Sequence, residues 1–311
     1  MTALKSFDDA GIQYAWDATS LSNYEKCPRY YQFVNLLGYQ PKGKSVHLIF
    51  GGLYAAALEH YYKHLTEGMS VDDATIAVVR AAMVETWEYE LDDDGEKILG
   101  SGKPWDSMHN TKTRETLIRS IVWYLDHFKK DETVVVTTNG VPAVEYSFAL
   151  PLDNDIVWCG HIDRLVWYGD DGYVMDQKTS GSTITSRFFN QFTPDIQMSG
   201  YTYAGRVIFN LPVKGVIIDA AQIAVGFTRF ERGFVHRTED QLDQWLDSSM
   251  QNILRARQDT ADNRFPMNRQ SCGNYGGCDF RDVCSASHSH SKRLLAADFV
   301  QRPRWDPLER R

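Results

Sequence analysis

The chain has few cysteines and no long apolar run. Only five of its 311 residues are cysteine, and their uneven spacing excludes the disulfide framework of a small secreted domain. A reducing compartment and metal ligation by thiols fit this usage better. No stretch approaches the roughly 18 apolar residues that a membrane-spanning helix needs, and no basic region followed by an apolar run opens the chain. We therefore expect a soluble protein of the cytoplasm with no membrane partner.

The chain also lacks an excess of basic residues. Its net charge of -8 excludes a protein that coats nucleic acid by bulk attraction. It does not exclude a nuclease, because a carboxylate site that holds divalent cations is itself acidic. Local basic stretches could follow phosphates or could be solvated helix faces: Lys112, Arg114 and Arg119, and Lys292 and Arg293. No G-x-x-x-x-G-K-[ST] loop is present, so ATP-driven unwinding would require a partner.

Hydrophobic periodicity predicts helices before Thr133 and mainly strands for some distance after it. The expected helices span residues 20–33 with a restart near Pro28, 50–65, 70–89, 111–129, 186–209 and 238 to about 266. The expected strands span 133–138, 143–150, 156–167, 173–178, 213–227 and 231–236, with turn signals that favour antiparallel hairpins. The tail beyond Ser285 should be loosely ordered. This order predicts one mixed α/β domain with a central twisted sheet and helices on its faces.

Acidic residues interrupt two of the apolar strands. Asp176 and Lys178 project to the same side of their strand, because strand side chains alternate. Asp163 lies thirteen residues earlier on the preceding strand, where it could face the same metal ion, and Glu145 is the next candidate. Carboxylates hold Mg²⁺ or Mn²⁺, while an ammonium positions water beside a phosphodiester. The alternative is an ordinary ion pair of Asp163 with Arg164 or Lys178.

Four of the cysteines lie near the two ends of the chain. Cys272, Cys278 and Cys284 are separated by two five-residue gaps in a glycine-rich segment, and Cys27 precedes Pro28. Four thiolates suit a metal or iron–sulfur centre that ties the first helix to the last segment. Zinc is the competing occupant, although structural zinc sites usually contain a closely spaced cysteine pair. Cys159 is expected to be a core thiol.

The order of these motifs resembles a known family. Gly160 and Asp163, then Asp176 and Lys178, then Gln197 and Tyr201 resemble the PD-(D/E)xK nuclease superfamily, in its RecB-like and Cas4-like branch that includes phage exonucleases. The resemblance implies a single nuclease domain over 1–311 with a restriction-endonuclease-like core at about 45–265. It further implies an iron–sulfur clamp subdomain of 20–35 plus 266–285, followed by a tail at 286–311.

The resemblance also implies an activity. The expected enzyme is a Mg²⁺- or Mn²⁺-dependent DNA exonuclease, acting at DNA ends or in single strands during recombination, repair or phage DNA processing, in the host cytoplasm if phage-encoded. Asp163 and Asp176 would bind the metal, with Glu145 as a further ligand, and Lys178 would assist the attacking water. Gln197 and Tyr201 share a helix face and would reach the DNA strand, or would form a buried packing pair.

The same resemblance implies a cofactor and partners. A [4Fe–4S] cluster would be held by the four terminal thiols, Cys27, Cys272, Cys278 and Cys284. The family allows association with a helicase, a recombinase or an annealing protein. Zinc in place of the cluster would suit a stapled structural protein, but that hypothesis leaves the acids and Lys178 unexplained.

The chain departs from the family pattern at one position. Ala55 stands where the family has a metal-binding histidine. Glu59, His60 or His161 could substitute for it, but each also fits a simpler role, Glu59 as a surface or supporting acid and the histidines as hydrogen-bonded polar residues. The departure supports an alternative function, a catalytically weak or inactive DNA-end-binding or recombination scaffold of the same fold.

Overall fold

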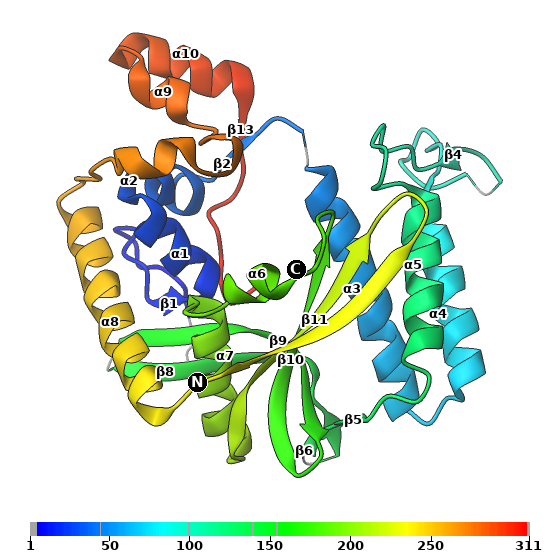
Figure 1. Cartoon of the computed structure of the whole chain (residues 1–311). Helices are drawn as coiled ribbons and strands as arrows, with labels where there is room; N and C mark the ends of the chain where they lie inside the picture. Colours follow the sequence, from blue (N-terminus) through cyan, green and yellow to red (C-terminus); the bar gives the residue numbers. More distant parts are fainter. Residues whose placement is uncertain (1–4, 44, 99, 139, 154, 310–311) are drawn as a thin grey trace.

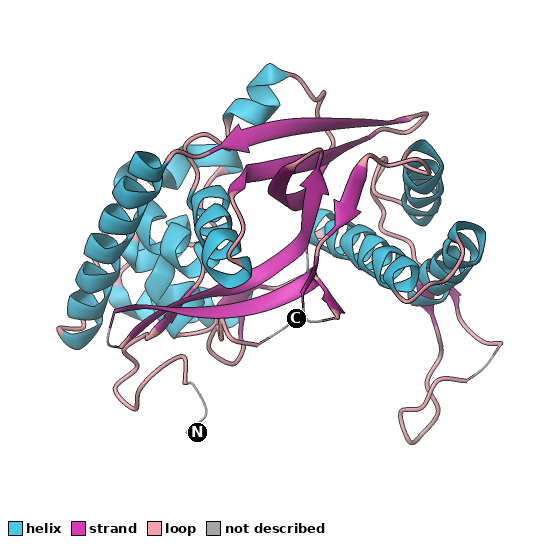
Figure 2. Ribbon diagram, turned by 90° about the horizontal axis from the view of Figure 1, so that it is seen from below, coloured by secondary structure: helices cyan, strands magenta, loops and turns pink. Residues whose placement is uncertain are grey.

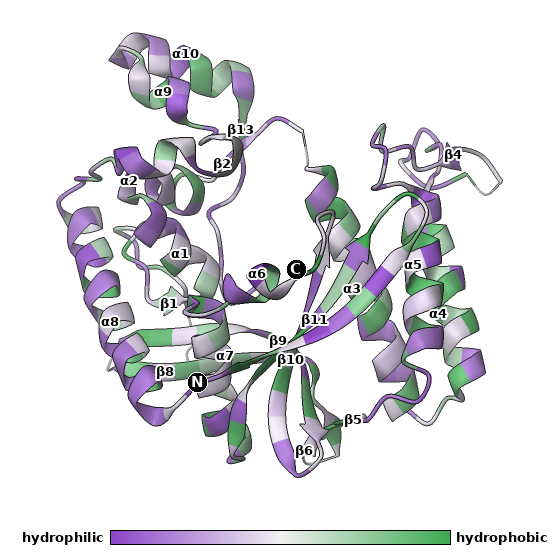
Figure 3. Ribbon diagram, in the orientation of Figure 1, coloured by the Kyte–Doolittle hydropathy of each residue, from purple (hydrophilic) through white to green (hydrophobic). Residues whose placement is uncertain are grey.

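A twisted sheet with helices on both faces forms the centre of the molecule (Figures 1 and 2). The computed structural model describes residues 5–43, 45–98, 100–138, 140–153 and 155–309. Figure 3 shows hydrophobic and hydrophilic residues on the same helices, as helices that pack one side on a sheet require. The expectation of an α/β fold with a mixed central sheet flanked by helices is confirmed.

The sheet has seven strands and is mixed. Its main path runs through β1 (Ala15–Trp16), β9 (Ile156–Tyr168), β10 (Asp171–Ser180), β11 (Val213–Ile223) and β12 (Thr228–His236), while β5 (Thr133–Val135) and β8 (Val144–Asp153) also pair with β9. The expected hairpins β8–β9 and β9–β10 are antiparallel. β10 and β11 are parallel, because the intervening helices carry the chain back to the starting edge.

Two helical layers cover this sheet. On one face α7 (Ile196–Phe209) packs with α1 (Ala18–Lys26) and α8 (Glu239–Ala261) over a core that includes Trp158. On the other face α3 (Val46–Thr66) and α5 (Arg114–His127) pack on the sheet, with α4 (Val71–Glu85) against them, around Phe50 and Leu117. Short strand pairs lie outside the main sheet: β3 (Trp87–Glu88) with β4 (Lys103–Pro104), and β6 (Thr137–Thr138) with β7 (Val141–Pro142).

The helix expected over 186–209 is two helices. α6 (Ser186–Asn190) ends before Pro194, and α7 begins at Ile196. Proline has no backbone N–H and its ring excludes the preceding turn of helix, so the chain cannot continue through it. Asp195 starts the second helix as its N-cap, where its side chain accepts a hydrogen bond from the Met198 N–H.

The expectation of a loosely ordered tail is wrong. α9 (Arg281–Ser285) is followed by α10 (His288–Asp298) and β13 (Phe299–Gln301), which pairs with β2 (Tyr39–Pro41). Phe299 stacks on Phe280 with 4.5 Å between ring centroids, and Phe280 stacks in turn on Phe33. These aromatic contacts join segments far apart in the sequence, so local periodicity did not reveal them.

The two ends of the chain form one subdomain (upper left in Figure 1). α2 (Pro28–Tyr31), the π-helical turn η1 (Gln32–Leu36) and the 3₁₀ segment η2 (Arg269–Gly276) join α9, α10 and the β2–β13 pair there. The Trp305 indole N–H donates a hydrogen bond to Asp17 Oδ2, which fastens the last residues beside α1. Within the ranges given above, no helix is both long and apolar enough to cross a membrane.

Candidate active site

The acids of the expected site meet where strands β9 and β10 separate. Their antiparallel ladder ends at the pair Met175–Arg164, and the next position in this register places Asp176 opposite Asp163. Asp163 Oδ2 accepts a hydrogen bond of 2.8 Å from the Gln177 N–H, which the ladder no longer uses. Lys178 Nζ lies 2.6 Å from Asp176 Oδ2. The structure therefore brings Asp163, Asp176 and Lys178 together.

Burial sets the electrostatics of these three groups. Burial and the neighbouring Asp176 raise the pKa of Asp163 to about 7, against the opposing effects of Lys178 and the Gln177 N–H. Burial also raises the pKa of Asp176, which is only 2% exposed, despite its ion pair with Lys178. Burial alone would lower the pKa of Lys178, but Asp176 and Asp163 outweigh it and the pKa is raised. Two acids so placed repel each other, and a divalent cation would relieve that repulsion.

Glu145 faces this pair from the strand on the other side of β9. The β8–β9 register pairs Val144 with Arg164 and Tyr146 with Ile162, so Glu145 lies opposite Asp163. Its charge contributes to the raised pKa of Asp163. The backbone of Glu145 has φ 48, a left-handed conformation that is costly for a non-glycine residue within a strand. Such local strain is typical of functional sites.

Gln197 and Tyr201 extend the site onto helix α7. Lys178 Nζ donates a hydrogen bond of 3.3 Å to Gln197 Oε1, and Gln197 Nε2 donates one of 3.0 Å to the Tyr201 hydroxyl. Burial raises the pKa of Tyr201 well above its usual range, and Asp163 and Asp176 raise it further. Gln197 and Tyr201 therefore form a polar chain to the lysine, in addition to packing against each other.

Asp195 belongs to the same electrostatic group and was not identified from the sequence. Its charge raises the pKa of both Asp176 and Lys178, while its side chain caps α7. An acid between a proline and an apolar helix is a recognisable N-cap signal, but that signal does not reveal a site. Asp195 lines a cavity of about 460 Å³ together with Glu145, Gly160, His161, Gln197 and Tyr201.

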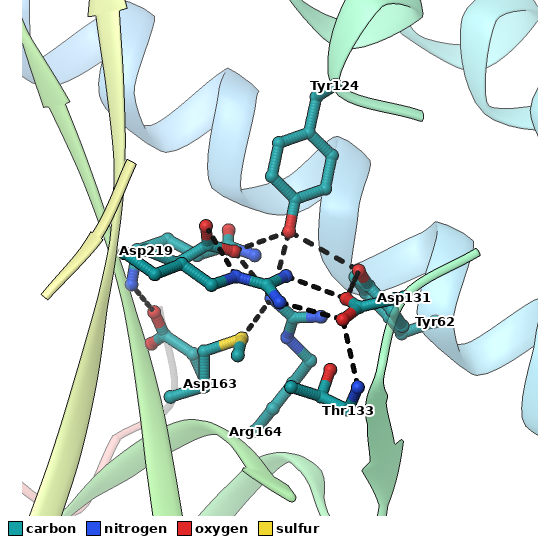
Figure 4. Close-up of polar contacts among 10 residues, drawn as sticks. Tyr62, Tyr124, Asp131, Thr133, Asp163, Arg164 and Asp219 are labelled. Carbon is teal, nitrogen blue, oxygen red and sulfur yellow. Dashed lines mark hydrogen bonds and ion pairs between the residues drawn. The ribbon is translucent and has the colours of Figure 1, made fainter. Parts of the chain in front are cut away.

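Arg164 points away from the candidate site into a buried polar network (Figure 4). Its Nη2 lies 3.0 Å from Asp219 Oδ2 and 3.2 Å from the Tyr124 hydroxyl, and its guanidinium stacks 3.6 Å from the centroid of the Tyr62 ring. Arg232 joins Asp219 to Asp131. Asp219, rather than Asp163, is therefore the ion-pair partner of Arg164, and the network ties β9 and β11 to helices α3 and α5.

Ala55 and the three proposed substitutes for a histidine lie in different places. Ala55 lines a second cavity, of about 360 Å³, which Lys178 also lines. Glu59 forms an ion pair with Lys63 one turn along α3, and neither Glu59 nor His60 lines either of these two cavities. The His161 Nδ1 lies 2.8 Å from the Ser147 hydroxyl at the wall of the first cavity. Of the three, only His161 thus lines the cavity that Glu145 and Asp195 also line.

The four terminal cysteines gather in the subdomain formed by the chain ends. All four are half-buried free thiols, and Cys27 Sγ accepts a hydrogen bond of 3.3 Å from the Asn268 N–H. Burial raises the pKa of Cys284, Arg29 lowers it, and negative charge on Cys278, Cys27 or Cys272 raises it again. Cys284 therefore interacts electrostatically with each of the other three thiols. Cys159 is buried in the core, as expected.

A bound metal ion needs several ligand atoms that converge on one point. In the described part of the chain, no group of three or more His, Cys, Asp or Glu is already placed to hold a metal ion. Mg²⁺ needs fewer protein ligands, because it commonly binds one or two carboxylates and takes its other ligands from water and phosphate. Asp163 and Asp176 fit that chemistry. The terminal cysteines supply the thiol chemistry of a cluster but are not yet arranged as its ligands.

Comparison with known proteins identifies a family. Residues 15–285 match the family model described as the PD-(D/E)XK nuclease superfamily. No curated protein matches the sequence. Among solved structures 14 chains match, one of them a protein of Eubacterium rectale described as a proposed exonuclease, with 14% identity and a TM-score of 0.46, covering 89% of this chain and 92% of that chain. A likeness at this level does not bear on the site or its activity.

Proposed function

The chain belongs to the PD-(D/E)XK nuclease superfamily, and on that premise we propose that it is a Mg²⁺- or Mn²⁺-dependent deoxyribonuclease. Its substrates are DNA ends or single strands, as in recombination, repair or phage DNA processing. The proposal rests mainly on one observation, the convergence of two buried, mutually repelling acids on one lysine at the end of the β9–β10 ladder. Buried acids are rarely kept beside each other in a protein unless they bind a cation or serve a reaction.

Each residue of the site has a role in this proposal. Asp163 and Asp176 would hold the divalent cation, with Glu145 as a further ligand from strand β8. When bound, the cation would supply positive charge that stabilises the phosphate as its ester bond breaks. Lys178 holds a proton at Nζ beside Asp176 and orients the attacking water. Gln197 positions that ammonium, and Tyr201 orients Gln197.

We further propose that Cys27, Cys272, Cys278 and Cys284 hold a [4Fe–4S] cluster, with zinc as the competing occupant. The supporting observation is that Cys284 interacts electrostatically with the other three thiols, with Arg29 near Cys284 and Lys26 near Cys278. A neighbouring cation favours the thiolate form that binds metal. Burial raises the pKa of both Cys278 and Cys284, and the two cations oppose that rise.

The nuclease proposal is tested by a time course on end-labelled linear DNA and on circular DNA, with Mg²⁺ and with Mn²⁺. The wild type should degrade linear DNA, and Asp176→Ala and Lys178→Met should each lose at least about 100-fold in rate, because both remove charge from the reacting centre. Asp171→Ala is the matched control. It removes an acid from the same strand, and Asp171 pairs with Lys214 at 3.8 Å, away from the site.

Two results would decide against the proposed enzyme. A wild-type protein that binds DNA ends but cleaves nothing with either metal would favour the scaffold function, for which the alanine at position 55 is the sequence support. Equal rates for wild type and Asp176→Ala would assign any observed cleavage to a contaminant. A helicase, recombinase or annealing partner remains a prediction.

A further inference from the structure

A second cavity borders the candidate active site at the end of strand β10. It is lined by Lys178 and its neighbours Gln177 and Thr179, by the first turns of α3, and by Lys112 from the segment before α5. On α3 the small residues Gly51, Gly52 and Ala55 form this wall. The cavity is thus continuous with the catalytic lysine of the proposed nuclease and has room for part of a nucleotide.

Lys112 is buried at this cavity without a polar partner. The residue is only 2% exposed, and its ammonium has no hydrogen-bond acceptor. The ammonium lies over the ring of Phe50, with 4.4 Å from Nζ to the ring centroid. Burial lowers the pKa of Lys112 to about 8. A buried ammonium without an anion costs free energy that one cation–π contact only partly offsets.

The neighbouring basic residues already donate hydrogen bonds within the protein. Arg114 donates hydrogen bonds to Thr86 Oγ1 and to the Met83 carbonyl, and Arg119 donates to the carbonyls of Ala224 and Val225. Of the three basic residues in this stretch, Lys112 is the one whose charged group has no described hydrogen-bond acceptor at all. The described lining of the cavity contains two lysines and His47 and no acid, which favours an anionic ligand.

We propose that Lys112 binds a phosphate group of the DNA strand in this cavity, next to the phosphate that is cleaved. The flexible four-carbon stem of lysine lets the ammonium rise from Phe50 to meet the anion. Ala55 leaves the space open, where a larger side chain would fill it. Lys112 is then a strand-positioning residue, and its role rests on the proposed nuclease function. The same chemistry suits an internal phosphodiester or a terminal phosphate of the strand.

Lys112→Met tests this role, because methionine keeps the apolar stem and removes the charge. Binding of a labelled single strand is followed by anisotropy in chelator, and KM and kcat by cleavage, each at several salt concentrations. We expect the dissociation constant for the strand and the KM each to rise about tenfold. The negative slope of the logarithm of the binding constant against the logarithm of salt concentration should become shallower by about 0.7, the value for one phosphate contact on a single strand. Lys112→Arg should restore the slope.

Thermal stability separates this role from a structural one. Lys112→Met should melt at the wild-type temperature or higher, because it removes an unmatched buried charge. Lys214→Met removes an exposed lysine at the far end of β11 and should leave binding and slope unchanged. Comparing strands with and without a 5′ phosphate locates the anion: equal losses indicate an internal phosphate, and a loss on the phosphorylated strand alone indicates the terminal one.

The possible failures are distinguishable. If the wild type neither binds nor cleaves DNA, the nuclease proposal fails and this role falls with it. If the wild type binds and cleaves while Lys112→Met shows the same KM, binding and salt slope, only the role of Lys112 is refuted. A Lys112→Met protein that loses stability and binding together would mark the lysine as structural and overturn the proposal.

Discussion

At the scale of single residues, the buried charges of the candidate site lower the stability of the folded protein. Asp163 and Asp176 lie opposite each other in the strand register, and burial raises the pKa of both. Lys178 compensates for only one negative charge, and Lys112 carries a positive charge with no described acceptor. Selection for stability alone would not leave charges of both signs so poorly matched. Substitution of these charged residues should therefore stabilise the metal-free protein and remove its function.

Asp163→Asn should therefore stabilise the protein in chelator. The pKa of Asp163 is raised to about 7 from an ordinary value near 4, so the folded state holds its proton more tightly than the unfolded state does. Its contribution to stability is present below about pH 4 and is lost as the pH rises towards 7. At pH 8 the variant should be more stable by about 2 to 4 kcal/mol, and the difference should vanish near pH 4.

Urea unfolding of both proteins across this pH range measures the effect. Asp155→Asn is the control of opposite sign. Asp155 forms an ion pair with Arg257 that lowers the pKa of Asp155, so loss of this pair should destabilise the protein slightly at neutral pH. Equal stability of wild type and Asp163→Asn at pH 8 would contradict the raised pKa. Added Mg²⁺ should stabilise the wild type more than Asp163→Asn.

At the scale of secondary structure, helix α7 must approach the sheet closely to deliver Gln197 and Tyr201. Gly200 makes this possible, because a Cβ there would lie 2.4 Å from the Trp158 ring. Trp158 is 1% exposed and meets Trp245 edge to face, so it has no space into which to move. The glycine in this helix is thus explained by packing and by the position of the site.

Gly200→Ala should destabilise the protein although alanine is the better helix former. The gain in helix propensity is about 1 kcal/mol, whereas forcing a methyl group into the Trp158 ring costs about 1 to 3 kcal/mol and shifts α7. We expect a net loss of about 1 to 2 kcal/mol in urea unfolding and a lower kcat. Gly52→Ala is the matched control: nothing lies within 4 Å of its Cβ, so it should gain about 0.5 to 1 kcal/mol. Stabilisation by both variants would refute the close approach of α7.

At the scale of the whole molecule, the two chain ends come together in one subdomain beside the core. β13 pairs with β2, Phe299 stacks on Phe280, and the four terminal cysteines lie in the same subdomain. This arrangement joins the first helices to the last, so a centre bound by the cysteines would close nearly the full length of the chain. Its loss should act on stability before it acts on the proposed hydrolysis, whose candidate site lies at the β9–β10 end of the sheet.

Cys27→Ser is expected to remove visible absorption from anaerobically purified protein and to lower its Tm, because the proposed cluster loses one of its four ligands. Destabilisation on the order of several kcal/mol is reasonable for a structural metal centre. Cys159→Ala is the matched control, since it removes a buried thiol from the core and should leave the absorption unchanged. A colourless wild-type protein with stoichiometric zinc would reject the iron–sulfur cluster but keep the clamp, and a metal-free wild-type protein would reject both.

The sequence by itself determined the order of the main helices and strands, the pairing of Asp176 with Lys178, and the family. These depend on local periodicity, on the alternation of strand side chains and on motif order. Tertiary structure alone decided that Arg164 pairs with Asp219, that Asp195 joins the acids, and that residues 288–301 fold onto β2. It also decided that Lys112 is buried without an acceptor, while Arg114 and Arg119 donate hydrogen bonds to neutral oxygens. The physical reason is that charge matching and burial depend on neighbours distant in the chain, which no local pattern specifies.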